Sequence, residues 1–344
     1  MTHKSSTGKI SRALLLFPVL TVVVMLVSIA VGSVSIPLTD TAQVLWNAIW
    51  KLPQPDSMAV PIVLSTRLPR VLCAALIGAA LSISGAAMQG LLKNPLADGT
   101  TVGVSGGASL GAVIAIVFGI TIPGLPFGGV MVLAIVFACL SLIAILTLAY
   151  KLDSSLSTNT IILLGVIFTM FTSSVVSLLI TFADDQIHSI TFWLMGSMSS
   201  SSYLNAILLL VATLSCGLVL FGCSRELNAF AISEDNARHI GVNVRRVKFT
   251  VLIAVSVLIG VCVAISGTIG FVGLVTPHMI RIIVGPNHRR LLPATVFGGA
   301  SFLMLADLVS RTIFSPRELP IGVVTSFVGA LFFLALFYHA RKRG

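Results

Sequence analysis

The sequence predicts an all-α polytopic membrane protein, and three observations carry this prediction. Of the 344 residues, 56% are hydrophobic and 9% are charged, whereas a soluble domain has roughly 25% charged residues. Mean hydropathy is +1.07, and long uncharged runs recur along the whole chain. Basic residues gather between alternate runs, as in cytoplasmic loops. The net charge of +10 therefore indicates membrane topology rather than nucleic-acid binding.

Ten runs are candidate membrane spans, because about 20 apolar residues cross a bilayer core of roughly 30 Å. The third and eighth runs are short and glycine-rich, so the count depends on them. The first is expected to be retained, since its apolar core is too long for a signal peptide. We expect one transmembrane domain over residues 1–344. The predicted spans are residues 12–32, 62–90, 99–118, 127–149, 158–182, 203–222, 246–266, 270–285, 293–313 and 320–340.

The distribution of basic residues predicts the orientation of these spans. With the N-terminus inside, all but five of the 21 lysine and arginine residues lie on the inner side. The positive-inside rule then places both termini in the cytoplasm. The five outer residues are Lys51, Arg67, Arg70, Arg311 and Arg317.

The second and third spans are rich in small residues. Gly78, Gly85, Gly107 and Gly111 form notches in otherwise apolar helices. Small residues allow helix backbones to approach closely within a membrane. We therefore expect these glycines to serve helix packing rather than a binding site.

A sequence repeat relates the two halves of the chain. Leu76-Ile77-Gly78 and Ile83-Ser84-Gly85 match Leu258-Ile259-Gly260 and Ile265-Ser266-Gly267, and Pro95 then matches Pro277. The second span is expected to run inward and the seventh outward, so the repeat is inverted. Inverted repeats with glycine- or proline-interrupted helices are typical of transporters.

The longest inner loop, residues 223–245, contains signals for a short helix. Ser233 is a candidate N-cap, Glu234 and Asp235 stand in the first turn, and Gly241 follows the last. A second short helix is a further option at 226–231. A solvated connector is the alternative reading, but a capped helix in so hydrophobic a chain favours a docking site.

A few polar residues lie in or near the predicted spans. Asp307 and Arg311 are four residues apart and can pair on one helix face, although an intramembrane carboxylate is also a functional candidate. The arginines at the outer ends of spans can bind an acidic partner or an anion. His278 is either a ligand or proton relay, or, as we favour, a hydrogen-bond donor to a carbonyl group near Pro277.

The sequence lacks two patterns that would indicate chemistry of its own. It has no Walker A motif and no metal-ligand spacing. The five cysteines lie in or beside apolar runs without CxxC spacing, which indicates apolar packing. We therefore expect no catalytic residue, no metal site and no bound cofactor in this chain.

Eight segments, in order along nearly the whole chain, together resemble the FecCD/BtuC family of ABC importer permeases. That family implies ten transmembrane helices, a pair of permease subunits, two ATPases that bind ATP and Mg²⁺, and an extracytoplasmic substrate-binding protein. One departure is that Asp98 and Gly99 follow NPLA, where the family usually has a proline. The segments are RLPR at 67–70, GAALSISGAAMQ at 78–89, NPLADG at 94–99, GVSGGA at 103–108, SGTIGFVGLVTPHMIR at 266–281, HRRLLP at 288–293, ADLVSR at 306–311 and ELPIGVVT at 318–325.

The resemblance also implies roles for individual residues. It implies that the binding protein docks on Arg67, Arg70 and Arg311. The residues implied to couple to the ATPase are Leu227, Ser233, Glu234, Asp235, Ala237, Arg238 and Gly241. The residues implied to form the cytoplasmic gate are Asn94, Leu96, Ser157 and Thr158. The translocation path between two subunits is expected along the fifth and tenth spans, and we assign Met170, Ser173, Ser174 and Ser177 to it.

These expectations describe a multi-pass protein of the cell membrane that imports a ferric siderophore with energy from separate ATPase subunits. Haem or cobalamin import is the alternative within the same mechanism, and either a homodimer or a heterodimer fits. Two readings of other classes remain. An ion-coupled secondary transporter would use Asp307, and a membrane scaffold would transport nothing.

Overall fold

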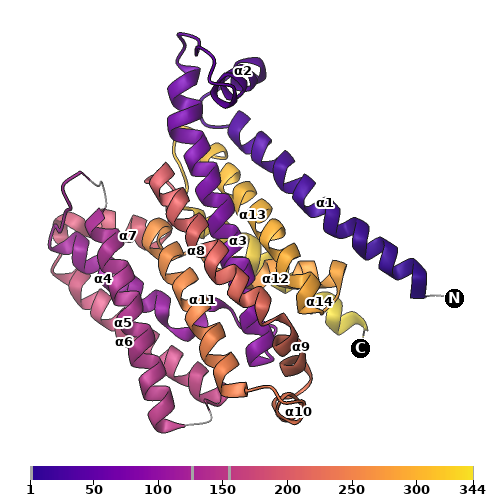
Figure 1. The fold of residues 1–344 in the computed structure, drawn as a ribbon. Coiled ribbons are helices and arrows are strands. Elements are labelled where there is room, and N and C mark those ends of the chain that lie inside the picture. The colour runs from indigo at the N-terminus through magenta and orange to yellow at the C-terminus, as the bar shows by residue number, and fades with distance from the viewer. Residues whose placement is uncertain (1–2, 125–127, 154–155, 344) are drawn as a thin grey trace.

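The computed structural model describes residues 3–124, 128–153 and 156–343, and this part of the chain is almost entirely helical (Figure 1). A π-helical segment, η1 (Pro61–Arg67), leads directly into α3, and a short 3₁₀ segment, η2 (Gly99–Val102), precedes α4. The α-helices are α1 (His3–Ala30), α2 (Leu38–Ile49), α3 (Leu68–Leu92), α4 (Val104–Val117), α5 (Gly128–Leu152), α6 (Thr158–Thr181), α7 (Ile187–Leu194), α8 (Tyr203–Gly222), α9 (Ser224–Ile232), α10 (Glu234–His239), α11 (Val244–Ser266), α12 (Val272–Val284), α13 (His288–Thr312) and α14 (Ile321–Arg343).

Each of the ten predicted spans coincides with a helix. Within the described residues, six helical segments are long and apolar enough to cross a membrane: Pro61–Leu92, α5, α6, α8, α11 and α13. The other four predicted spans correspond to shorter apolar stretches within α1, α4, α12 and α14, namely Leu15–Ala30, Val104–Val117, Val272–Val284 and Ile321–Leu336. The all-helical membrane architecture is confirmed. The count of ten crossings and the side on which the termini lie remain predictions.

Helix α3 is the centre around which the other helices pack (Figure 1). Nearly every residue from Pro69 to Leu92 is buried, so this helix has no solvent-facing or lipid-facing stripe. Gly78 lies against the backbone of Gly299 in α13, and Gly85 lies against Gly273 in α12. The expectation that these glycines allow close helix packing is confirmed.

Close packing at glycines also joins α4 to α5. A Cβ on Gly107 would overlap the side chain of Ser141, and one on Gly111 would overlap the Leu133 carbonyl oxygen. The four-residue spacing places both glycines on the face of α4 that contacts α5. The predicted role of this pair in packing is confirmed as well.

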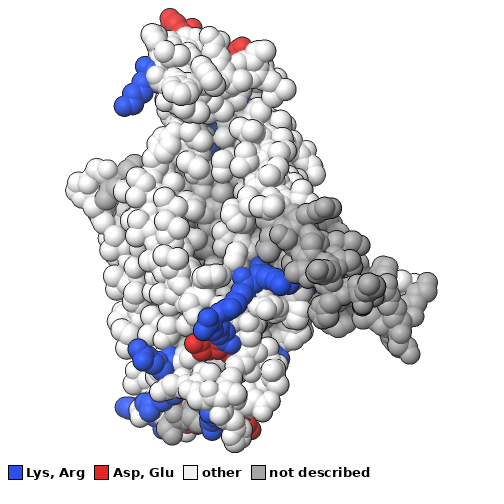
Figure 2. Space-filling view, turned by 45° about the vertical axis from the view of Figure 1, so that its right-hand side comes forward, with Lys and Arg blue, Asp and Glu red and all other residues white. Residues whose placement is uncertain are grey.

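Charged side chains avoid the middle of the molecule. Figure 2 shows lysine and arginine gathered toward the lower end together with some acidic groups, a few acidic and basic groups at the upper end, and a broad band without charges between them. This band consists largely of exposed leucine, isoleucine, valine and phenylalanine side chains. Such a belt suits contact with lipid hydrocarbon, in which an unpaired charge is costly.

Two helices and one local detail were not predicted. Trp46 of α2 and Trp50 directly after it are exposed, as in the aromatic belts of membrane interfaces, and α7 follows α6. Both helices are too short to be recognised as membrane spans from hydropathy. The matched prolines of the repeat also differ, because Pro95 lies in the turn after α3 whereas Pro277 lies inside α12.

Candidate functional site

A buried ion-pair cluster joins α3, α13 and the segment before α14. Arg70 Nε lies 2.9 Å from Asp307 Oδ1, and Arg70 Nη1 lies 2.8 Å from Glu318 Oε2. On the other side, Arg311 Nε lies 3.1 Å from Asp307 Oδ2. The predicted Asp307–Arg311 pair is therefore confirmed. Asp307 is fully buried, and two guanidinium groups offset the cost of placing its carboxylate there.

Arg67 has a different environment. Its Nη1 donates hydrogen bonds to the carbonyl oxygens of Ile29 (3.0 Å) and Ala30 (2.7 Å), and its Nη2 donates to that of Val34. The side chain thus caps the C-terminal end of α1, where unpaired carbonyls attract cations. Gly32 leaves room for it, since a Cβ there would lie 2.8 Å from Arg67 Nη2.

The three arginines expected to receive a docking partner are therefore buried in this subunit. Arg311 also donates to the Ser28 carbonyl oxygen of α1. Together, Arg67, Arg70 and Arg311 hold α1, α3 and α13 together instead of forming an open basic patch. Their docking role stays a prediction, and the group accessible beside them is Glu318, whose side chain is 35% exposed.

Helices α9 and α10 form the predicted short-helix unit. Ser233 accepts a hydrogen bond from the Asn236 backbone N–H at 2.9 Å, and Gly241 has φ of +85°. The cap, the helix and its glycine end are confirmed, and the second helix begins two residues earlier than expected. Figure 1 shows both helices at one end of the bundle.

The candidate coupling residues of this unit divide into inner and outer groups. Leu227 and Ala237 are buried, and Ala237 packs with Phe230 and Val244 in a small core. Asp235, Arg238 and Gly241 are exposed. Sequence analysis missed the exposed apolar residues Ile232 and Ile240, which are 74% and 71% exposed; an isoleucine beside charged residues at a helix end was the available signal.

Two polar contacts fasten this unit to the transmembrane helices. Lys248 of α11 binds Glu234 and the Leu156 carbonyl oxygen. Asn228 of α9 accepts a hydrogen bond from the His288 backbone N–H at 2.8 Å, at the start of α13. Sequence analysis assigned no role to Lys248 or Asn228, because their partners are distant in sequence.

The candidate gate residues lie in two turns. Asn94 Oδ1 accepts a hydrogen bond from the Leu96 N–H at 2.9 Å, and the Leu96 side chain is exposed. Ser157 caps α6 by accepting from the Thr160 N–H, and Thr158 is the first residue of that helix. The unusual Asp98 accepts from the Thr100 N–H at 2.9 Å, so this carboxylate stabilises the turn that opens η2.

The candidate path residues share one face of α6. Met170, Ser173, Ser174 and Ser177 are all exposed, while the Ser174 and Ser177 hydroxyls donate to backbone carbonyls of their own helix. This hydrogen bonding satisfies hydroxyl groups in an apolar setting. The face is available either to lipid or to a second subunit.

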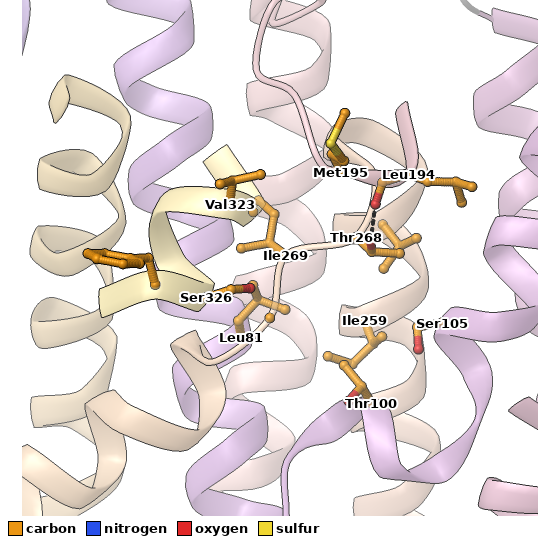
Figure 3. A pocket seen from close by; sticks show the side chains of 14 residues that line it. Leu81, Thr100, Ser105, Leu194, Met195, Ile259, Thr268, Ile269, Val323 and Ser326 are labelled. Carbon is orange, nitrogen blue, oxygen red and sulfur yellow. Dashed lines mark hydrogen bonds between the residues drawn. The ribbon is translucent and has the colours of Figure 1, made fainter. Parts of the chain in front are cut away.

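A cavity of about 730 Å³ opens among α3, α4, α11, α14 and the 268–270 segment (Figure 3). Thr100, Ser105 and Ser326 bring hydroxyl groups to an otherwise apolar wall, and Thr268 donates to the Leu194 carbonyl oxygen. Among the described residues that line it, none is charged. This cavity was not predicted, because its walls come from segments far apart in the chain.

A second cavity of about 840 Å³ lies beside α7 and the start of α8. Aromatic side chains of Phe192 and Trp193 line it together with the serine-rich segment 199–202 and Asn205. Its described walls carry one titratable group, His188. Both cavities thus present hydroxyl and apolar surfaces, and the second adds the amide of Asn205.

Residues 20–339 match the FecCD transport family. The chain is 44% identical over 321 residues to the uncharacterized ABC transporter permease protein YvrB of Bacillus subtilis, covering 93% of this chain and 91% of YvrB. It is 34% identical over 327 residues to the molybdate import system permease protein MolB of Haemophilus influenzae, covering 94% and 95%.

A solved structure described as an inward-facing conformation of an ABC transporter assigned to the metal-chelate type has the same fold. Its TM-score is 0.84 at 32% identity, and the match covers 96% of this chain and 99% of that one. The chain therefore belongs to the FecCD transport family and is a multi-pass membrane permease of the ABC importer type, a transport subunit distinct from the ATPase.

Proposed function

We propose that this chain is one of two permease subunits of an importer that carries a bulky organic metal chelate, with a ferric siderophore as the first candidate. The observation that carries this proposal is the pair of cavities without a fixed charge. Their volumes lie within the roughly 300–1,000 Å³ of sites for organic ligands. Haem and cobalamin belong to the same class of cargo and are the alternatives within it.

A small oxyanion, the cargo named for MolB, fits these walls less well. Oxyanions are bound by arginine, lysine or arrays of N–H donors. The hydroxyl-bearing apolar wall around Ser105 and Ser326 supplies none of the cationic groups. It suits the organic shell of a chelate that must pass without being held tightly.

The partners follow from the surfaces at the two ends of the subunit. Two cytoplasmic ATPases that bind ATP and Mg²⁺ would contact α9 and α10, where Ile232 and Ile240 project. A second permease, identical or not, would cover the exposed face of α6. In this arrangement the protein lies in the cell membrane with both termini in the cytoplasm.

A binding protein would deliver the chelate at the opposite end. There, Glu318 holds Arg70 through both carboxylate oxygens, at 3.0 and 2.8 Å. A carboxylate of the incoming protein can compete with Glu318 for Arg70, because both are charge-assisted partners of similar strength. Docking then requires Glu318 to move aside rather than a free arginine.

The test is uptake by the complete transporter, purified from native membranes and reconstituted in vesicles. The cargoes compared are a ferric siderophore, haem, cobalamin and molybdate, each with its binding protein. We expect chelate uptake that requires ATP hydrolysis, and no uptake of molybdate. Uptake by the permease alone, without ATPase, would overturn the importer proposal in favour of ion coupling, while uptake of molybdate alone would overturn the cargo assignment.

A further inference from the structure

Lys248 is a buried lysine at the end of α11 that lies nearest α10. Its side chain is 1% exposed, which is rare for lysine unless it is paired. Nζ lies 2.8 Å from the Leu156 carbonyl oxygen, 2.9 Å from Glu234 Oε1 and 3.0 Å from Glu234 Oε2. An ammonium group has three donors and no acceptor, and these contacts use them.

The three contacts join three separate segments. Glu234 is the first residue of α10, Lys248 belongs to α11, and Leu156 precedes the two candidate gate residues, Ser157 and Thr158. Leu156 is fully buried and has φ of +51°, a conformation that costs a non-glycine residue energy and persists only when its surroundings enforce it. Lys248 is one of the groups that hold this carbonyl in place.

Helix α10 packs against α9 and against the start of α11. Ser233 caps α10, and Phe230 of α9 and Ala237 of α10 form a small core with Val244 of α11. Arg238 also pairs with Glu234, at 3.2 Å within one helix. A displacement of α10 therefore carries the Glu234 carboxylate with it, and this carboxylate is paired with the Lys248 ammonium at 2.9 Å.

We propose that Lys248 is a positioning residue that connects α10 to the start of α6. When the ATPase moves α10, Glu234 draws Lys248, and Lys248 draws the Leu156 carbonyl and with it the N-terminal turn of α6. The inference rests on the proposed function, because it presupposes an ATPase at α10. It adds a mechanical link, made of one salt bridge and one hydrogen bond, between the docking unit and the gate.

The test measures cargo transported per ATP hydrolysed in the reconstituted transporter. The variants are Lys248→Met, which keeps the length of the side chain, Glu234→Gln and the double variant. Arg246→Met is the control, since Arg246 is an exposed residue on the same helix. We expect the ratio to fall by roughly fivefold or more in each single variant, the lower end of typical coupling between sites. The double variant should be no worse than Lys248→Met, because both substitutions break the same link.

A second measurement distinguishes a link that carries motion from α10 to α6 from a purely structural role of Lys248. Hydrogen exchange of the α6 amides from 159 to 165 should change on ATP binding in the wild type and in Arg246→Met, but not in Lys248→Met. Equal losses of assembly, ATP hydrolysis and transport would mean that Lys248 only anchors the fold, and would overturn the proposal. So would an unchanged ratio in Glu234→Gln, a variant expected to fold because Glu234 is partly exposed. Failure of the wild type to couple transport to ATP would instead overturn the proposed function.

Discussion

Gly85 of α3 lies directly against the backbone of Gly273 in α12, and a Cβ on Gly85 would overlap the Gly273 carbonyl oxygen. This contact sets how closely the two helices approach. In a membrane, such backbone packing contributes to helix association because lipid supplies no hydrophobic drive between helices.

Gly85→Ala should therefore destabilise the protein. Overpacking a close-packed site costs roughly 1–3 kcal/mol, and here the obstacle is backbone that cannot rotate away. Thermal unfolding of the purified protein in detergent measures the loss. Gly217→Ala in α8 is the matched control, because its Cβ would meet Ile83 Cδ1 at an ordinary 3.8 Å. Equal melting temperatures for the two variants would contradict this reading.

Asp307→Asn should be the more harmful of two changes in the ion-pair cluster. Removing one partner of a buried pair costs roughly 3–5 kcal/mol, and Asp307 serves both Arg70 and Arg311. Glu318→Gln removes a partly exposed partner, for which about 1 kcal/mol or less is expected. Melting temperatures rank the two variants.

The Asp307→Asn variant also distinguishes a structural role of Asp307 from a role in ion coupling. With two arginines bound to it, Asp307 is not a free proton carrier. If Asp307→Asn kept the wild-type melting temperature but abolished uptake in vesicles lacking ATPase, the secondary-transporter reading would gain support.

How far the sequence predicts this cluster depends on the distance along the chain. Asp307 and Arg311 are four residues apart in the sequence, so helical periodicity alone predicted their contact. The Arg70–Asp307 contact joins residues 237 apart and depends on how α3 packs against α13. Hydropathy specifies which runs are helical but not which helix faces meet. For that reason the burial of the arginines, the Lys248 contacts and the cavities could not be predicted from the sequence.

In the α9–α10 unit, by contrast, local sequence signals were enough to predict a helix. Ser233, the acidic first turn and Gly241 predicted α10, because caps depend on neighbouring residues only. What they left open was the direction of each side chain. Leu227 and Ala237 turned out to be core residues, and Ile232 and Ile240 the exposed ones.

Arg67→Met should loosen the end of α1. The variant loses the hydrogen bonds to Ile29, Ala30 and Val34 but keeps most of the side-chain volume. Limited proteolysis of the purified protein should cut the 31–37 segment faster than in the wild type. Arg317→Met, at an exposed position, should be cut at the wild-type rate. Protection of 31–37 in both variants would show that Arg67 does not tether α1.

Cys223, in the turn between α8 and α9, should react slowly with alkylating agents. Burial and, to a lesser degree, the nearby Glu226 carboxylate raise the pKa of its thiol. A raised pKa leaves less thiolate at a given pH, and the thiolate is the nucleophile. The alkylation rate, followed by mass spectrometry, should therefore rise only above the pH at which an ordinary thiol ionises. Glu226→Gln should move this profile toward lower pH, and an unshifted profile would contradict the role of the carboxylate.

Ser326→Trp should obstruct the smaller cavity. Ser326 lies on α14 and its hydroxyl faces the space that Thr100 and Ser105 border from other elements (Figure 3). An indole there occupies volume that a bulky chelate needs, since organic-ligand sites have roughly 300–1,000 Å³, so uptake should fall well below that of the wild type. ATP hydrolysis by the assembled transporter should persist, since none of the residues that line this cavity belongs to α9 or α10. Ser215→Trp, on the exposed face of α8, is the control and should transport normally. Full uptake by Ser326→Trp would place the route elsewhere, along the exposed face of α6 that carries Met170 and Ser177, and the substitution Ser177→Trp would then be the one that blocks it.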